Sequence, residues 1–118
     1  MNKVRIGRRA EQEARAYFEK KGFIVVDHNF RCRFGEIDLI IRKQKSLRFV
    51  EVKYRTHIDH GLPQEAVVKR KQQRIRASAL HWLKRRHLPV DGELHFDVLA
   101  LHRDTQGKTA YEYIEDAF

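Results

Sequence analysis

Cysteine is almost absent from this sequence, because Cys32 is the only one among 118 residues. A single thiol cannot form an internal disulfide, which fits a reducing compartment better than a secretory one. Long apolar runs are missing too: no stretch approaches the roughly 20 apolar residues of a membrane-spanning helix. The first residues carry charges throughout and lack the apolar core of a signal peptide. We therefore expect a cytoplasmic protein with no membrane association.

Residues that interrupt helices and strands are also scarce: the sequence has two prolines and six glycines. The sequence shows no linker, internal repeat or low-complexity tract. Apolar residues make up 42% and occur in distinct clusters, and 118 residues is the usual length of one domain. We expect a single domain over residues 1–118.

Acidic residues are outnumbered, 16 against 25 Lys and Arg, which gives a net charge of +9. A surplus of this size favours a polyanionic partner, because neutralised phosphates release counterions. Nucleic acid is therefore the favoured partner. The alternatives are an acidic protein, an anionic membrane surface, or a charge that serves solubility alone.

The hydrophobic pattern predicts seven elements. A helix over residues 4–21 precedes a short buried strand over residues 23–27. Two apolar runs, residues 35–43 and 47–55, flank Gln44, Lys45 and Ser46 and predict a β-hairpin. A helix over residues 64–87 and strands over 94–102 and 109–114 complete the order αβββαββ. Because a helix joins the third strand to the fourth, we expect an α/β fold with a mixed β-sheet flanked by helices.

The hairpin carries the most informative segments, GEIDLI (35–40) and FVEVK (49–53). A turn centred between Gln44 and Lys45 sets Asp38 opposite Glu51, with Lys53 on the same face. Two carboxylates on an apolar hairpin are costly unless compensated, and Mg²⁺ would compensate them. Lys53 could then hold or deprotonate a water molecule. The alternatives are an ion pair on a solvated face, or a one-residue slip that moves Asp38 to the other face.

The spacing D-x12-E-x-K across a β-hairpin, after an acidic helix, resembles the PD-(D/E)XK nuclease superfamily with its restriction endonuclease-like fold. Within it, the chain is most similar to the uncharacterised bacterial YraN-like proteins, which are similar to Holliday junction resolvases. The likeness runs nearly end to end. The matching motifs are G-x-x-A-E (7–11), N-x-R (29–31), GEIDLI (35–40), FVEVK-x-R (49–55), Lys71, FDV (96–98) and the terminal DAF.

The resemblance implies a metal-dependent nuclease. Asp38 and Glu51 would bind Mg²⁺ or Mn²⁺, Glu11 would complete the site, and Lys53 would stabilise the phosphorane charge or position the attacking water. The substrate would be DNA, branched or single-stranded, and the resolvases imply a homodimer. The superfamily's proline before the first acid is absent, since Ile37 precedes Asp38.

Several basic and polar residues are candidates for phosphate contact. Glu11 lies at the edge of the apolar stripe of its helix, so it could reach the site or pair with Arg8 or Arg15. Lys71 could extend over the site or turn to solvent along its aliphatic stem. Asn29, Arg31 and Arg33 are expected in a loop at the mouth of the site, where Asn29 could instead make a turn. The full set of predicted nucleic-acid contacts is Asn29, Arg31, Arg33, Arg55, Lys69, Arg70, Lys71 and Arg74.

Four other residues are given no catalytic role. Asp97 could be structural, paired with a buried arginine, and Cys32 lacks a triad partner. The pair His57 and His60 has no second set of nitrogen or sulfur ligands at a spacing that suits zinc.

Three functions remain in competition at this point. The leading one is a Mg²⁺-dependent DNA phosphodiesterase with little base readout. The second is a nucleic-acid-binding protein without useful cleavage, and the third is a protein that docks an acidic partner.

Overall fold

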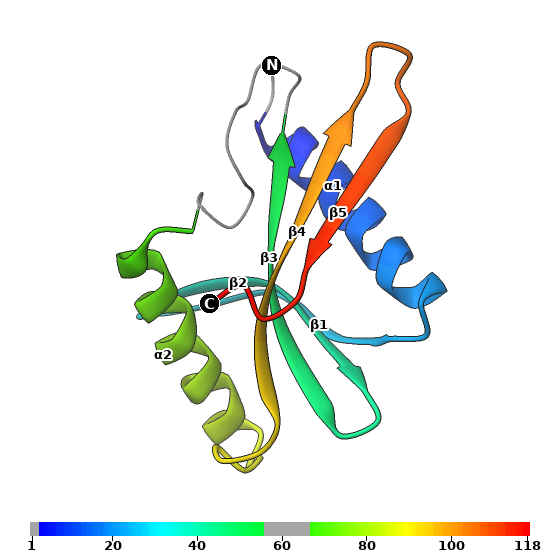
Figure 1. Ribbon diagram of the computed structural model, residues 1–118. Helices are drawn as coiled ribbons and strands as arrows, with labels where there is room; N and C mark the ends of the chain where they lie inside the picture. The colour runs from blue at the N-terminus through cyan, green and yellow to red at the C-terminus, as the bar shows by residue number, and fades with distance from the viewer. Residues whose placement is uncertain (1–2, 56–66) are drawn as a thin grey trace.

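The computed structural model describes residues 3–55 and 67–118, with side chains from residue 7 onward within those ranges. Its element order confirms the predicted αβββαββ arrangement (Figure 1). The elements are α1 (Lys3–Lys20), β1 (Ile24–Cys32), β2 (Gly35–Lys43), β3 (Ser46–Arg55), α2 (Lys69–Arg85), β4 (Leu94–Arg103) and β5 (Thr109–Ile114). The predicted loop with His57 and His60 lies outside the described residues.

The five strands form one mixed sheet in the order β1-β2-β3-β4-β5. Strands β3 and β4 are parallel, as expected for strands joined through a helix, and the other neighbours are antiparallel. The helices cover opposite faces (Figure 1). One core packs Phe18 of α1 against Leu39, and the other packs Trp82 of α2 against Ile40 and Phe49. Neither described helix has the length and apolarity needed to cross a bilayer.

Strands β2 and β3 separate halfway along their length. Their ladder has the predicted register and ends at the pair Leu39 and Val50. Beyond it, within the described parts of the chain, β2 pairs with β1 alone, and β3 pairs with β4 alone as far as Arg55. Figure 1 shows the β1–β2 hairpin bending away while β3 and β4 continue together. We call this point, where Asp38 and Glu51 lie, the fork.

Strand β1 is longer and less buried than predicted. It extends to Cys32, so Asn29 and Arg31 lie in a strand paired with β2, and the expected loop there was wrong. Its first residue, Ile24, is 55% exposed. Polar residues 27–29 interrupt the apolar pattern, and Asn29 has a left-handed φ of 49°. An outermost strand with one neighbour tolerates such residues, which is why the sequence pattern missed it.

Helix α2 is shorter than the predicted range of residues 64–87. Val67 and Val68 precede it, and residues 64–66 lie outside the described residues. Val68, an apolar residue within that predicted range, is the N-cap residue, extended and 61% exposed. Extended N-cap geometry removes it from the helical stripe. The helix ends at Arg85, before His87 with its left-handed φ of 56°.

Candidate active site at the fork of the sheet

Asp38 bridges the fork through its carboxylate. Its Oδ2 accepts a hydrogen bond from the backbone amide of Val52 at 2.8 Å. Because β2 has left the ladder, this carboxylate satisfies an amide that a neighbouring strand would otherwise pair. Burial and the negative charge of Glu51 raise the pKa of Asp38 to about 7. Glu51 is therefore close enough to oppose the ionisation of Asp38.

Glu51 is buried on β3 with two lysines at one of its oxygens. The residue is only 6% exposed. Lys71 Nζ of α2 lies 2.7 Å from Glu51 Oε1, and Lys53 Nζ lies 3.8 Å from the same atom. The predicted neighbourhood of Asp38, Glu51 and Lys53 is thus present, and α2 adds Lys71 to it. The sequence left open whether Lys71 extends over the site or turns to solvent, and the structure shows it extending to the site.

The two lysines differ in their proton affinity. Burial, and then the hydrogen bond and charge of Lys71, lower the pKa of Lys53. Burial also acts to lower the pKa of Lys71, but the hydrogen bond and charge of Glu51 outweigh it and raise that pKa. Lys71 is therefore the resident positive charge beside Glu51, and Lys53 is the more readily deprotonated amine.

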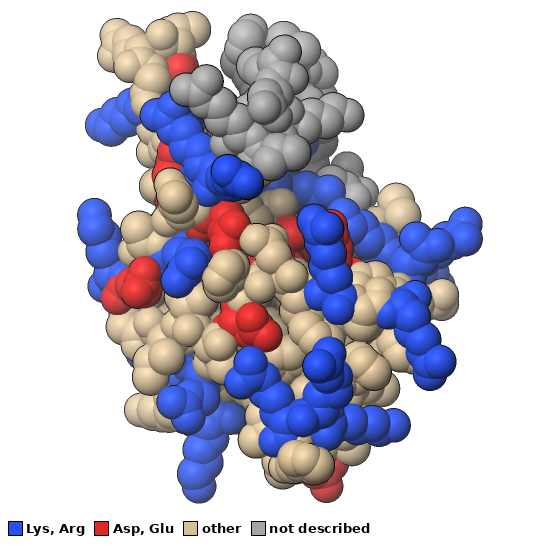
Figure 2. Space-filling model, turned by 180° about the vertical axis from the view of Figure 1, so that it is seen from behind, with Lys and Arg blue, Asp and Glu red and all other residues tan. Residues whose placement is uncertain are grey.

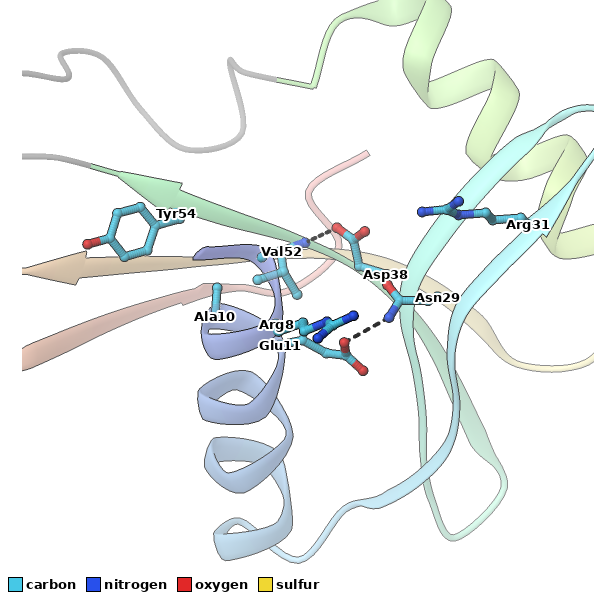
Figure 3. Close-up of a pocket in the computed structure, with 9 residues that line it drawn as sticks. Arg8, Ala10, Glu11, Asn29, Arg31, Asp38, Val52 and Tyr54 are labelled. Atoms are coloured by element: carbon cyan, nitrogen blue, oxygen red, sulfur yellow. Dashed lines mark hydrogen bonds between the residues drawn. The ribbon is translucent and has the colours of Figure 1, made fainter. Parts of the chain in front are cut away.

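Glu11 reaches the same region from α1 but is held by β1. Its Oε1 lies 2.6 Å from His28 Nδ1, and its Oε2 accepts a hydrogen bond from Asn29 Nδ2 at 2.7 Å. Glu11 and Asp38 both line one pocket (Figure 3). The structure thus brings Glu11 into the pocket that Asp38 lines, with both carboxylate oxygens of Glu11 already engaged. Sequence reasoning missed His28, since nothing in the local pattern links it to a helix residue.

The pocket beside Asp38 has a volume of about 520 Å³ and lies between α1 and strands β1, β2 and β3. Figure 3 shows Arg8 and Arg31 with their guanidinium groups toward Asn29 and Asp38. Arg31 also pairs with Glu36, Nε to Oε2 at 3.2 Å. Among the described residues, the lining consists of Gly7, Arg8, Ala10, Glu11, Asn29, Arg31, Asp38, Val52 and Tyr54.

The remaining predicted phosphate contacts divide into two groups. Arg70, Lys71 and Arg74 line a second pocket of about 320 Å³ with Gly35 and Glu36. Lys69, Arg33 and Arg55 line neither pocket: Lys69 is exposed, Arg33 lies over the Phe34 ring at 4.9 Å, and Arg55 ends β3. Figure 2 shows acidic side chains near the middle of one face of the molecule, with Lys and Arg side chains around them.

Asp97 has a structural role, as predicted. It is fully buried, and Arg48 Nη1 donates to both of its oxygens at 3.0 and 3.1 Å. Tyr113 and the backbone amide of Asp116 donate to it as well. Cys32 contacts Ser78, Sγ to Oγ at 3.5 Å, away from the acids of the fork.

The residues at the fork fit a hard divalent cation only as a partial ligand set. Across residues 3–55 and 67–118, no three His, Cys, Asp or Glu side chains already form a metal-binding group. Asp38 and Glu51 supply two adjacent carboxylates, and burial, followed by the negative charge of Glu51, raises the pKa of Asp38. Mg²⁺ is commonly held by one or two carboxylates with water and substrate phosphates as further ligands. The donor chemistry therefore suits Mg²⁺ in the presence of a phosphate.

The structure is that of an α/β protein with a charged site between strands. It has a mixed five-stranded sheet, a helix on each face of that sheet, and a cluster of acids and lysines at the fork. Comparison with known sequences then places it more narrowly. The chain belongs to the uncharacterised protein family UPF0102, whose sequence pattern matches residues 10–101.

Relatives at full length support this membership. A UPF0102 protein of Geobacter sulfurreducens is 42% identical over 117 residues, covering 99% of this chain and 90% of the relative. One from Syntrophus aciditrophicus is 43% identical over 115 residues, covering 98% and 89%. One from Dictyoglomus turgidum is 38% identical over 119 residues, covering both chains completely. The expected kinship with an uncharacterised bacterial family is confirmed, and these names state no activity.

Among solved structures, the chain is similar to Pyrococcus furiosus SfsA, determined in complex with Ca²⁺. The sequence identity is 16% and the TM-score 0.38, with 95% of this chain and 63% of that chain covered. A likeness this slight supports no functional argument.

Proposed function

We propose that this protein is a Mg²⁺-dependent phosphodiesterase that cleaves DNA. The supporting observation is the meeting of Asp38, buried Glu51 and Lys53 at the fork, with Lys53 Nζ 3.8 Å from Glu51. Two acids and a lysine of lowered pKa suit the hydrolysis of a phosphodiester better than they suit binding alone. The restriction endonuclease-like fold, the link to resolvases, a homodimer and a cytoplasmic location belong to the same proposal.

Each acid has a defined part in this proposal. Asp38 and Glu51 would hold Mg²⁺ or Mn²⁺, and Glu11 would contribute from α1 by exchanging its bond to His28 or Asn29. When bound, the metal neutralises the phosphate and lowers the pKa of a coordinated water.

The basic residues act on the substrate directly. Lys53 positions the attacking water or stabilises the charge that develops on the phosphorane. Arg31 and Asn29 on one side of the fork, with Arg70 and Arg74 on the other, hold neighbouring phosphates. The scissile phosphate is thereby placed between the two pockets.

Binding of nucleic acid without cleavage is the competing function, and one observation favours it. Lys71 Nζ already supplies a positive charge at 2.7 Å from Glu51, so the site is partly neutralised without a metal. A protein of this kind would use the acids to orient lysines toward phosphate.

Cleavage assays separate the two functions. Labelled four-way junction, flap, duplex and single-stranded DNA are incubated with Mg²⁺, Mn²⁺ or EDTA. We expect metal-dependent cutting that Asp38→Asn and Lys53→Met each reduce by about 100-fold or more, while Lys45→Met in the β2–β3 turn cuts normally. Equal DNA binding by all four proteins with no cutting of any substrate would establish the binding function instead.

Metal binding is tested without relying on activity. Excess Mg²⁺ should raise the melting temperature of the wild-type protein, because a ligand that binds only the folded state stabilises it. Asp38→Asn should abolish most of that rise. An equal rise in both proteins would place the metal elsewhere.

A further inference from the structure

The pocket beside Asp38 has a mixed lining that the proposed hydrolysis does not require. Its volume of about 520 Å³ lies in the range of small-ligand sites, roughly 300–1,000 Å³. Beside the charged residues it offers Val52 and the half-buried ring of Tyr54. A phosphate alone needs no apolar wall and no aromatic ring, whereas a nucleoside uses both.

Two neighbouring arginines of α1 are used differently. Arg9 pairs with Glu13 on the helix surface, Nε to Oε1 at 3.3 Å. Arg8 lines the pocket, and Figure 3 shows its guanidinium directed toward Asn29 and Glu11. The next residue along the helix therefore provides a chemically matched control for any role of Arg8.

The second pocket continues the positive lining on the other side of the fork. Arg70, Lys71 and Arg74 line it, and Lys71 also contacts Glu51. A DNA strand with one phosphate at the fork would have a cationic pocket on each side of that phosphate. The pocket with Tyr54 has an aromatic ring on which a base could stack. The pocket on α2 has charged groups and two aliphatic side chains, Val68 and Ile75, and its lining among the described residues includes no ring.

We infer that the pocket of Arg8, Asn29 and Tyr54 receives one unpaired nucleotide next to the scissile phosphate. Arg8 and Arg31 bind its phosphate, Asn29 offers an amide for hydrogen bonding, and Tyr54 stacks on its base. A base inside a duplex must leave its pair and its stack to enter a concave pocket. The substrate class is therefore DNA with unpaired bases at the cleavage point. The inference rests on the proposed function for the position of that point.

Binding in EDTA tests the pocket without cleavage. A fluorescent single-stranded oligodeoxynucleotide containing 2-aminopurine is titrated with protein, beside a duplex of the same length. We expect at least tenfold tighter binding of the single strand and quenching of 2-aminopurine on stacking. Equal affinity for the duplex, or unchanged 2-aminopurine fluorescence, would overturn the inference.

Matched variants locate the effect. Tyr54→Leu should weaken single-strand binding about tenfold and remove the quenching, whereas Tyr54→Phe retains both. Arg8→Gln should weaken binding severalfold, and Arg9→Gln should leave it near wild type. Thermal unfolding confirms that each variant folds. If Tyr54→Leu does not fold, the pair Arg8→Gln and Arg9→Gln decides, and equal affinities there refute the pocket.

The two proposals can fail separately. If Tyr54→Leu loses the quenching and no condition gives cleavage, the nucleotide pocket is supported and the nuclease proposal is refuted. Cleavage of fully paired duplex as fast as of single strand, with both reactions lost in Asp38→Asn, supports the nuclease and refutes the unpaired nucleotide.

Discussion

At the scale of single residues, Asp38 links stability to pH. Its pKa rises from 3.8 to about 7 in the folded protein, so between those values the folded state binds more protons than the unfolded state. The free energy of unfolding therefore falls as pH rises through that window. Asp38→Asn keeps an oxygen for the Val52 amide and removes the titration. We expect the variant to be more stable than wild type above about pH 7, with the difference disappearing near pH 4.

Urea denaturation of both proteins across this pH range measures the effect. The exposed Asp91→Asn is the control, which should follow wild type at every pH. Parallel curves for wild type and Asp38→Asn would show that Asp38 does not titrate abnormally.

Lys71 competes with any cation for Glu51, because its Nζ lies 2.7 Å from Oε1. Lys71→Met should therefore bind Mg²⁺ more tightly than wild type. Without metal it should lose about 1–3 kcal/mol of unfolding free energy, since buried Glu51 is left with fewer partners. Titration calorimetry and urea denaturation measure the two quantities, with exposed Lys69→Met as control. Weaker Mg²⁺ binding in Lys71→Met would mean that the lysine does not occupy the metal position.

The sequence predicted part of the candidate site and missed part of it. Asp38, Glu51 and Lys53 follow from the register of one hairpin, which depends only on a two-residue turn. His28 and Tyr54 carry no comparable signal, because their relation to the site depends on how α1 and β1 pack against the fork. Side chains joined by tertiary packing lie beyond any short-range spacing rule.

At the scale of elements, Asp97 joins three strands. It accepts hydrogen bonds from Arg48 of β3 and Tyr113 of β5, and Arg48 is only 13% exposed. Asp97→Ala should cost about 3–5 kcal/mol, because it leaves the buried charge of Arg48 with only the more distant carboxylate of Glu115, at 3.6 Å. Combining Arg48→Met with Asp97→Ala should cost less than the sum of the two single losses. A double-mutant cycle by urea denaturation measures the coupling, and strictly additive losses would contradict it.

Element types were predictable where one periodicity dominates, as in α1 and β5. The exceptions have local physical causes. In β1 the polar residues of an outermost strand resemble a loop, and at the start of α2 Val68 continues an apolar pattern into an extended cap. The separation of β2 from β3 has no sequence signal of its own, because it depends on packing against both helices.

At the scale of the whole molecule, the net charge of +9 should make nucleic-acid binding depend on salt. Arg8, Arg31, Arg70 and Arg74 line the two pockets beside the fork. If each neutralises one phosphate of a single strand, the logarithm of the affinity should fall with the logarithm of salt concentration with a slope of about −3.

Fluorescence anisotropy over a range of NaCl concentrations gives this slope. Arg8→Gln should make it less steep by about 0.7, and Arg9→Gln should not change it. A slope near zero would exclude a partner that binds mainly through its phosphates. It would then support neither DNA cleavage nor nucleic-acid binding as the function.

The hydrogen bond that closes the fork also supplies a spectroscopic probe. The backbone amide of Val52 donates its proton to Asp38 Oδ2, with 2.8 Å between the amide nitrogen and that oxygen. The magnetic environment of the amide therefore depends on the charge of the oxygen. In a ¹⁵N-labelled sample, the chemical shift of the Val52 amide should therefore change when Asp38 is protonated, when a cation binds and when a phosphate binds. The chain thus contains its own reporter for the state of the candidate site, with no label added to any side chain.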